Sequence, residues 1–339
     1  MNQITGDVLP HAPPIYPLKR LLDSPQLQEY QSVVVLNKGD TVFAVIGDIA
    51  VPIDARVQDV REWLNEMNVG EHVTDSIRKS GMARTSIAHL GLSVTVVGPS
   101  YDIYISRNAK NIMTWEEGQW PTEIRDITKF AYGVIIVAGL GQSGRSMLSA
   151  TMLDHIASER KLSWSFDIKI KYNSPYVVSY DTGLGNTFAT PMLAIYAAME
   201  AKPVKAINVG VIESEEMAQI CYDCASIGKI VIGTVDAPDA IEALKTITRW
   251  GVPSHQVTTL TNGIIALRLP VLPGINKRFP FTEAIIPDKN IKSIIQAGDY
   301  DNLRNRLNES QGGWSFAAAG RIAAAKHNLS YDAIRMLVE

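Results

Sequence analysis

The sequence predicts an α/β protein in which a small N-terminal module precedes a larger core of sheet and helices. Three observations lead to this class. From about residue 123, apolar runs typical of buried strands alternate with helical apolar spacing, as a parallel sheet with covering helices requires. Before residue 110, short strand-like segments separated by turn residues indicate hairpins. A glycine-rich segment also connects one core strand to the next helix.

Residues 1–110 are expected to form the N-terminal α/β domain, and residues 111–122 a linker. The apolar spacing of Val57, Val60, Leu64 and Met67 predicts a helix in this domain. Two hairpins surround it, with predicted strands at 32–36, 41–46, 93–97 and 101–105.

Residues 123–339 are expected to form the core. Besides the strand that precedes the glycine-rich segment, its clearest strands are predicted at 206–211 and 229–235. From about residue 288 the pattern becomes helical. The helices of this tail are predicted at 291–297, 301–308, 314–326 and 331–338.

The glycine-rich segment, residues 139–146, reads Gly-Leu-Gly-Gln-Ser-Gly-Arg-Ser and lies between a predicted strand and a predicted helix. Glycines let consecutive backbone N–H groups and a helix N-terminus point at one phosphate, while the last serine is placed for Mg²⁺. The predicted nucleotide-binding residues are Gly139, Gly141, Gln142, Ser143, Gly144, Arg145, Ser146 and Met147, with Ser146 as the Mg²⁺ ligand.

Arg145 stands where a phosphate-binding loop has lysine. A guanidinium is a wide planar fork, whereas lysine reaches the β and γ phosphates as a compact ammonium, so the two are not interchangeable. We therefore expect that nucleotide binding is weak and that hydrolysis is not fast. A glycine-rich turn that binds no ligand stays open as an alternative.

Composition and charge argue against nucleic acid binding and against a membrane span. The chain has 339 residues, 46% of them hydrophobic, and a net charge of −3 without a block of like charge, so direct nucleic acid binding is not expected. No apolar run approaches the roughly 20 residues that span a bilayer. The N-terminus does not have the pattern of a signal peptide. We expect a cytoplasmic protein, peripheral at the inner membrane at most.

Cys221 and Cys224 have the spacing of a metal or redox pair. Zinc needs four ligands, and no second cysteine or histidine pair accompanies this one. Two small residues buried on one helix are the better interpretation, and no zinc is expected.

Several segments together resemble the pilus-retraction, or twitching-motility, branch of the secretion ATPase superfamily. They are the loop at 139–146, residues 208–214, residues 225–237, the tail from Ile294 to Asp332, and residues 81–87 of the N-terminal module. The resemblance implies a PAS-like N-terminal domain and a RecA-like P-loop core. It also implies ATP with Mg²⁺ as ligand, a homo-oligomeric ring that is a hexamer, and an inner-membrane platform protein as partner.

Catalytic positions of the family are altered here. The water-orienting glutamate falls at Val211, and the histidine of a threonine-leucine-histidine turn falls at Asp236, a negative charge expected to repel a polyphosphate. Asp167 is the one candidate left for the family's other catalytic carboxylate. Arg84 matches one of the arginines that the family offers to a neighbouring subunit.

The leading hypothesis is a motor-family subunit of a type IV pilus, type IV secretion or conjugation system. It would bind nucleotide weakly, hydrolyse little or none, and act beside an active partner ATPase. Two alternatives stay open: a slow ATPase that uses Asp167, and a nucleotide-free structural adaptor ring.

Overall fold

The structure, a computed structural model, describes most of the chain from residue 32 onward. The described ranges are 32–36, 40–46, 49–53, 56–66, 82–87, 92–97, 102–107, 112–159, 161–167, 172, 174–183, 187–272, 278–327 and 329–338. The chain divides into two compact units, one built mainly from residues 1–110 and the other mainly from residue 111 onward.

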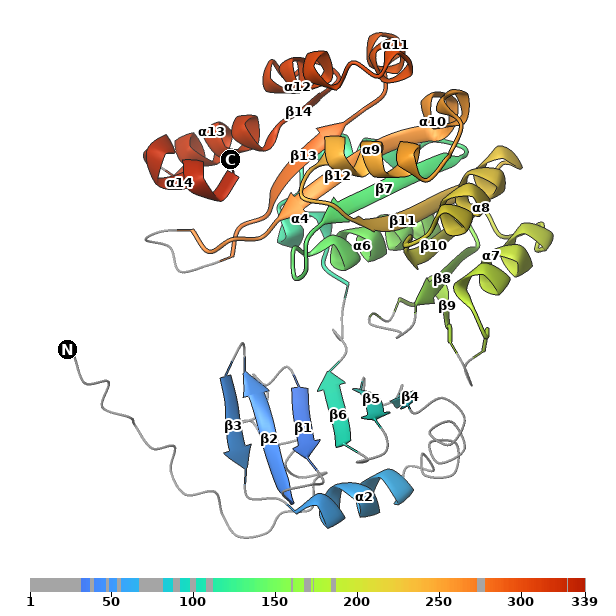
Figure 1. Ribbon diagram of the computed structural model, residues 1–339, viewed down its shortest axis with the longest axis vertical. Helices are drawn as coiled ribbons and strands as arrows, with labels where there is room; N and C mark the ends of the chain where they lie inside the picture. The colour runs from blue at the N-terminus through green and yellow to red at the C-terminus, as the bar shows by residue number, and fades with distance from the viewer. Residues whose placement is uncertain are drawn as a thin grey trace. The chain divides into compact units, whose positions relative to one another are not determined.

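The N-terminal unit contains a six-stranded antiparallel sheet and helix α2 (Val57–Glu66) (Figure 1). Its strands are β1 (Ser32–Leu36), β2 (Thr41–Ile46), β3 (Ile49–Ile53), β4 (Met82–Ile87), β5 (Leu92–Val97) and β6 (Asp102–Arg107). They lie in the order β3-β2-β1-β6-β5-β4. The backbone N–H of Val57, at the start of α2, donates to the Asp40 carboxylate at 3.1 Å. The four predicted strands and the helix are confirmed, and β3 and β4 are additions to them.

The second unit is built on an eight-stranded sheet in the order β14-β13-β12-β7-β11-β10-β8-β9. From β12 to β9 all neighbours are parallel, whereas β13 and β14 are antiparallel additions at one edge. The strands are β7 (Gly133–Gly139), β8 (Ser163–Asp167), β9 (Val177–Asp181), β10 (Ala206–Val211), β11 (Ile230–Asp236), β12 (Thr261–Arg268), β13 (Phe281–Ile285) and β14 (Gly313–Trp314). This parallel-rich sheet confirms the predicted α/β class.

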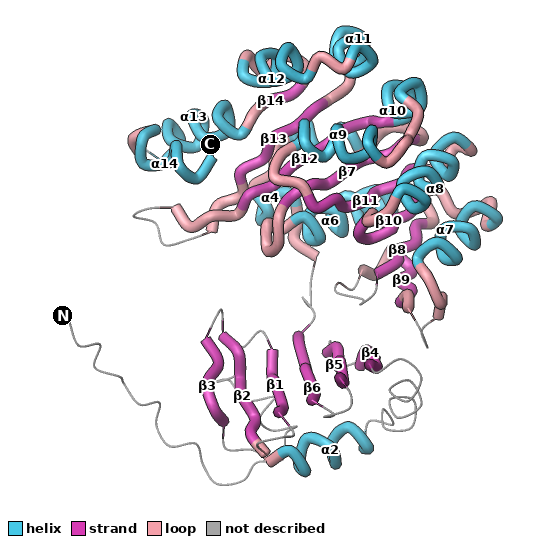
Figure 2. The backbone as a smooth tube through the Cα atoms, viewed as in Figure 1, coloured by secondary structure: helices cyan, strands magenta, loops and turns pink. Residues whose placement is uncertain are grey.

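Helices cover both faces of this sheet (Figure 2). Along the central strand β7, Val134, Ile136 and Ala138 join one buried apolar cluster, while Ile135 and Val137 join another. This alternation follows from the two-residue period of a strand, and both faces are apolar because both are covered. The helices over the sheet are α5 (Thr122–Ile127) and α6 (Arg145–Ser158) on one face, and α7 (Pro191–Glu200), α8 (Glu215–Ser226), α9 (Ala240–Arg249) and α10 (Ser254–Leu260) on the other.

Residues 112–121 are a folded part of the second unit, which differs from the linker expected across 111–122. They contain the short helix α4 (Trp115–Gly118), whose first turn is closed by a capping box between Thr114 and Glu117. The ring of Trp120 packs in the cluster under α5 and α6. Because the segment buries aromatic side chains, it is ordered against the core.

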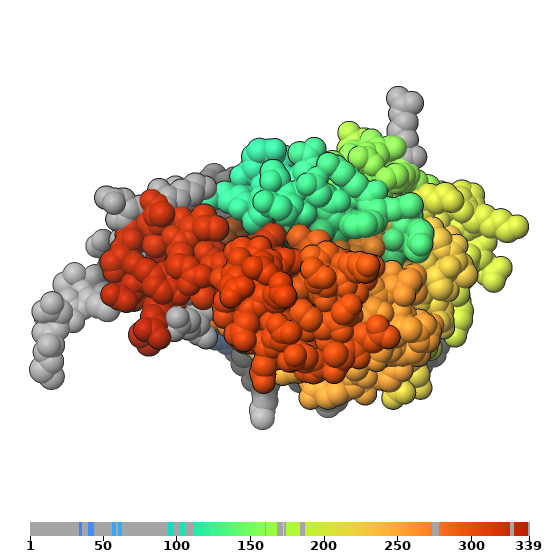
Figure 3. Space-filling view, turned by 90° about the horizontal axis from the view of Figure 1, so that it is seen from above, coloured from blue at the N-terminus to red at the C-terminus, as the bar shows by residue number. Residues whose placement is uncertain are grey.

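The C-terminal tail is helical, as predicted, with α11 (Lys289–Ala297), α12 (Tyr300–Asn308), α13 (Phe316–His327) and α14 (Tyr331–Val338). These red-orange helices lie beside the teal-green segment that opens the second unit (Figure 3). A cavity of about 450 Å³ between them is lined by Gln119, Glu123 and Ile322, among others. None of the helices in the described part of the chain is both long enough and apolar enough to cross a bilayer.

Candidate functional site

The predicted corner between strand and helix is present in the structure. Strand β7 ends at Gly139, and α6 begins at Arg145 with Gly144 as its N-cap. Gly144 has φ +91°, a left-handed conformation that a residue without Cβ adopts at little cost. Within the loop, the N–H of Ser143 donates to the carbonyl of Leu140 at 3.2 Å. The first amides of α6 have no acceptor inside the helix, so they are available to an anion at this end.

Ser143 supplies an independent sign of a ligand. The residue is 6% exposed, and its buried Oγ has no hydrogen-bond partner in the part of the chain that the structure describes. A buried hydroxyl without a partner costs about 1–3 kcal/mol. Ser143 lines a cavity and lies beside a helix N-terminus, so an anion or a ligand oxygen bound there would complete the bonding of this hydroxyl.

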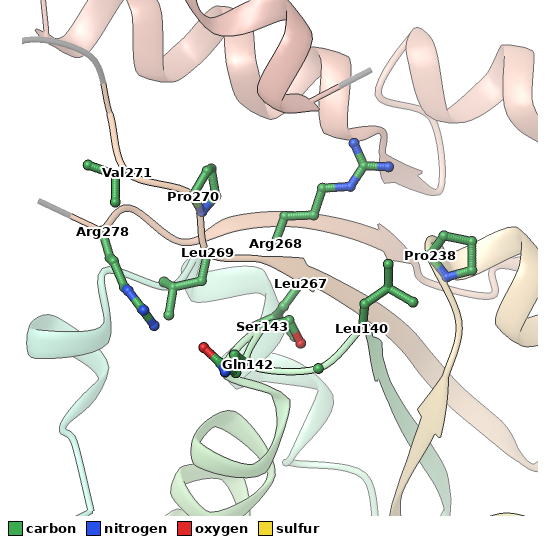
Figure 4. Close-up of a pocket in the computed structure, with 11 residues that line it drawn as sticks. Leu140, Gln142, Ser143, Pro238, Leu267, Arg268, Leu269, Pro270, Val271 and Arg278 are labelled. Atoms are coloured by element: carbon green, nitrogen blue, oxygen red, sulfur yellow. The ribbon is translucent and has the colours of Figure 1, made fainter. Parts of the chain in front are cut away.

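The cavity over the loop has a volume of about 470 Å³. Its floor is the loop itself, and its opposite wall comes from the chain around the β12–β13 connection (Figure 4). The lining residues are Leu140, Gly141, Gln142, Ser143, Pro238, Leu267, Arg268, Leu269, Pro270, Val271 and Arg278. The volume lies within the range of small-molecule sites.

Two arginines line this cavity, and they point in different directions. Arg278 extends toward Gln142 and the loop, whereas Arg268 turns away from the loop (Figure 4). The Arg268 guanidinium lies 4.3 Å from the centre of the Phe316 ring, in a cation–π contact. Arg278 is therefore the cation that faces the loop from across the cavity.

Arg145, the residue in place of the lysine, folds back onto the end of the sheet. Its Nη1 donates to the carbonyl of Gly139 at 2.8 Å and forms an ion pair with the Asp236 carboxylate. The two strands are neighbours, and Gly139 and Asp236 are paired residues of β7 and β11. The carboxylate that was expected to face a polyphosphate as an unpaired charge is thus bound to Arg145.

Two further predicted positions, Val211 and Asp167, lie at the carboxyl ends of strands, as the loop does. Strands β7, β11, β10 and β8 are parallel, so their carboxyl ends lie on the same side of the sheet. Val211 ends β10 and is half-buried. Asp167 ends β8, three strands away from β7, a separation of roughly 14 Å at the usual spacing of strands. The structure therefore brings Asp236 to the loop and keeps Asp167 at a distance from it.

Ser146 is the second residue of α6 and is half-buried. Met147, the third, accepts a hydrogen bond at its sulfur from the N–H of Met113, at 3.4 Å, and is not among the cavity residues. Arg84 lies on β4, paired with Thr95, and its side chain is outside the described residues.

Cys221 and Cys224 are both fully buried on α8, in agreement with the predicted packing role. Desolvation raises the pKa of both thiols, that of Cys224 to about 12, so neither is a reactive thiolate near neutral pH. Among the described residues, no group of three or more histidine, cysteine, aspartate and glutamate side chains is placed to bind a metal ion.

The sequence patterns did not single out the far wall of the cavity. Leu269, Pro270 and Arg278 follow no phosphate-binding motif and lie more than 120 residues after the loop. They reach it because β12 is the parallel neighbour of β7 and β13 returns antiparallel to β12. That placement depends on strand order, which short apolar runs do not encode.

Comparison with known proteins decides the family. The sequence model of the family described as "Type II/IV secretion system protein" matches residues 108–298, more than half of the chain. The chain belongs to this family. The superfamily that the motifs indicated is thereby confirmed, whereas the retraction branch within it stays a prediction.

Curated relatives of this secretion family match over part of their length. The type IV pilus assembly ATPase PilB of Thermus thermophilus is 26% identical over 147 residues, which is 43% of this chain and 16% of that protein. The type II secretion system protein HxcR of Pseudomonas aeruginosa is 21% identical over 225 residues, 66% of this chain and 42% of that one. This chain thus spans less than half of the length of these relatives.

Solved structures share the fold over nearly the whole chain. The ATPase DotB of Legionella pneumophila has a TM-score of 0.74 at 14% identity and covers 97% of this chain, with 98% of its own length aligned. The pilus retraction motor PilT, solved with bound ADP, has a TM-score of 0.78 at 16% identity. The match covers 92% of this chain and 94% of the PilT chain. The RecA-like secretion ATPase fold is therefore shared by this secretion-family chain.

Proposed function

We propose that this chain binds the polyphosphate of ATP at residues 139–146, weakly, as a subunit of a secretion or pilus machine, and that it hydrolyses little ATP or none. The observation that carries the proposal is Ser143, which lines a cavity above a helix N-terminus and whose buried Oγ has no hydrogen-bond partner among the residues that the structure describes. The named relatives support it, since PilT was solved with ADP and DotB is described as an ATPase.

The residues present fit such a ligand. Backbone N–H groups of Gly141, Gln142 and Gly144, with the Ser143 hydroxyl, would hold the phosphates, and the Ser146 hydroxyl would bind Mg²⁺. Bound Mg²⁺ would neutralise charge between the β and γ phosphates. Gly141 has open space around it, so a phosphate can approach the backbone there.

Low hydrolysis follows from two side chains. Val211 is apolar, so it cannot orient an attacking water as a glutamate does, and loss of a general base costs roughly 10² to 10⁴ in rate. Arg145 is paired to Asp236 and directed at the Gly139 carbonyl, so it does not extend over the loop. The slow-ATPase alternative needs Asp167, which lies three strands from the loop.

Assembly is part of the same proposal. Family membership and fold support a homo-oligomeric ring, a hexamer, in which a PAS-like N-terminal domain (1–110) offers Arg84 to the nucleotide core (123–339) of a neighbour. The ring would act in the cytoplasm beside an active ATPase, at an inner-membrane platform protein. Native mass spectrometry of the purified protein would measure the number of subunits, and a monomer at micromolar concentration would contradict the ring.

The test of nucleotide binding is thermal unfolding with and without MgATP. A ligand at 100 times its Kd adds about 2.7 kcal/mol of stability, so the melting temperature should rise with millimolar MgATP and much less in a Ser143→Ala variant. No shift in the wild-type protein at millimolar MgATP would favour the nucleotide-free adaptor ring.

Hydrolysis is tested by phosphate release with malachite green. We expect little release from the wild-type protein, and more after Arg145→Lys and Val211→Glu are introduced together. Wild-type turnover of ~1 s⁻¹ or more, abolished by Ser146→Ala, would contradict the proposed loss of hydrolysis. Loss of that turnover in Asp167→Asn would establish the slow-ATPase alternative instead.

A further inference from the structure

Arg145 and Asp236 are bound to one another at the place where a phosphate is expected. Arg145 is the first residue of α6, and its Nη1 contacts both the Gly139 carbonyl and the Asp236 carboxylate. The arginine side chain is 15% exposed, whereas that of Asp236 is 66% exposed. The carboxylate is therefore the accessible partner of a largely enclosed guanidinium.

The electrostatics explain why this pair forms. A cation at the first position of a helix is unfavourable, because the N-terminal end of the helix dipole is positive. No acidic residue lies in the first turn of α6 to offset that charge. Asp236 supplies a negative charge beside it from the neighbouring strand, in register with Gly139. A bound phosphate would supply the same kind of charge from the loop side.

We propose that Asp236 is an internal competitor of the nucleotide, in that its carboxylate takes the place of a phosphate at Arg145 while the site is empty. This inference rests on the proposed function and specifies how the affinity of that site is set. When a polyphosphate occupies the loop, Arg145 leaves Asp236 and turns to the phosphate oxygens, which accept from a guanidinium in the same forked geometry as a carboxylate.

The competition lowers affinity in two ways. Arg145 must give up its ion pair before it can contact the ligand, and the Asp236 carboxylate remains near the ligand as a like charge. Both effects are weakened if residue 236 is neutral but of the same size, because an asparagine holds the guanidinium by a neutral hydrogen bond at most and carries no charge. Asp236→Asn should therefore tighten the binding of MgADP, by roughly tenfold.

The experiment compares three proteins by calorimetric titration with MgADP. Asp126→Asn is the matched control, since Asp126 is also paired to a cation, Lys129, and its side chain is 62% exposed, close to the 66% of Asp236. The inference predicts tighter binding in Asp236→Asn and an unchanged Kd in Asp126→Asn. An unchanged Kd in Asp236→Asn, or equal tightening in both variants, would overturn it.

A double variant tests whether the gain in MgADP affinity depends on Arg145. In an Arg145→Gln background, Asp236→Asn should gain clearly less than it does in the wild-type protein, because no guanidinium is left to be released. A full gain in that background would show simple repulsion and contradict the competition at Arg145. If neither MgADP nor inorganic tripolyphosphate binds the wild-type protein or Asp236→Asn, the proposed nucleotide site itself is wrong. Binding by the wild-type protein without a gain in Asp236→Asn refutes the competitor alone.

Discussion

The buried carboxylate of Glu283 accepts a hydrogen bond from the backbone N–H of Ala240 at 3.0 Å, at the start of α9. Its second oxygen accepts from the N–H of Phe316 at 3.2 Å, at the start of α13. One side chain on β13 therefore holds the N-termini of two helices that pack on the sheet. Desolvation, followed by the nearby charge of Asp239, raises the pKa of Glu283 above its ordinary value.

This raised pKa predicts the sign of a pH effect. A carboxyl whose pKa is higher in the folded state stabilises the protein below its ordinary value of 4.5, and that contribution is lost as the pH rises through the raised value. Relative to a Glu283→Gln variant, the wild-type protein should therefore lose free energy of unfolding as the pH rises above 4.5. Urea unfolding followed by circular dichroism at several pH values measures the difference. A difference between the wild-type protein and Glu283→Gln that does not change with pH would contradict the prediction.

Replacing Ser143 by alanine should have opposite effects on the empty and the filled site. Removing a buried hydroxyl that has no partner among the described residues should stabilise the empty protein by about 1 kcal/mol. The same change should weaken nucleotide binding, because one donor to the phosphate is lost. Thermal unfolding without ligand and titration with MgADP measure the two effects. A variant that is less stable when empty would mean that the hydroxyl already has a partner.

Two glycines of the loop should respond differently to alanine. A Cβ at Gly139 would fall on the Ser143 side chain and within 3.0 Å of the Leu267 carbonyl oxygen, whereas a Cβ at Gly141 meets nothing within 4 Å. Gly139→Ala should cost about 1–3 kcal/mol, the usual range for overpacking. Gly141→Ala should stay within about 0.5 kcal/mol of the wild-type protein. Equal stability of the two variants in urea unfolding would show that β7 and the loop can move apart.

Arg278 should contribute to binding, and Arg268 should not. Arg278 points to the loop, so Arg278→Gln should weaken MgADP binding by roughly tenfold, the loss of one charge-assisted hydrogen bond. Arg268→Gln should leave that affinity unchanged and cost about 0.5–1 kcal/mol of stability through its contact with Phe316. Equal losses of affinity in both variants would argue against a specific role for Arg278.

Much of the fold follows from the sequence, and the exceptions have physical reasons. The central strand β7, the loop and α6 are predictable because a run of apolar residues, then glycines, then helical spacing mark them clearly. Strands β8 and β9, at one edge of the sheet, were not singled out because they are only partly buried and carry polar and aromatic residues. The segment at 112–121 contains Gly118 and Pro121, which favour a loop. Thr114 and Glu117, however, have the residue types and the spacing of a capping box, which indicates the start of a helix.

The site was predictable only in part. The loop comes from one continuous segment, so a motif is enough to find it. Arg278 enters from a distant hairpin, and its place depends on which strands are neighbours. The pair between Arg145 and Asp236 likewise needs β7 and β11 side by side, which no local pattern encodes.

Met113 is tied to the middle of α6 as well as to its first turn. Its N–H donates to the Met147 sulfur, and its carbonyl accepts from the Thr151 hydroxyl at 2.9 Å. The polypeptide that enters the second unit is therefore hydrogen-bonded to α6, the helix whose N-terminus follows the loop. Any shift of α6 relative to the sheet would therefore also move Met113 or break these two hydrogen bonds.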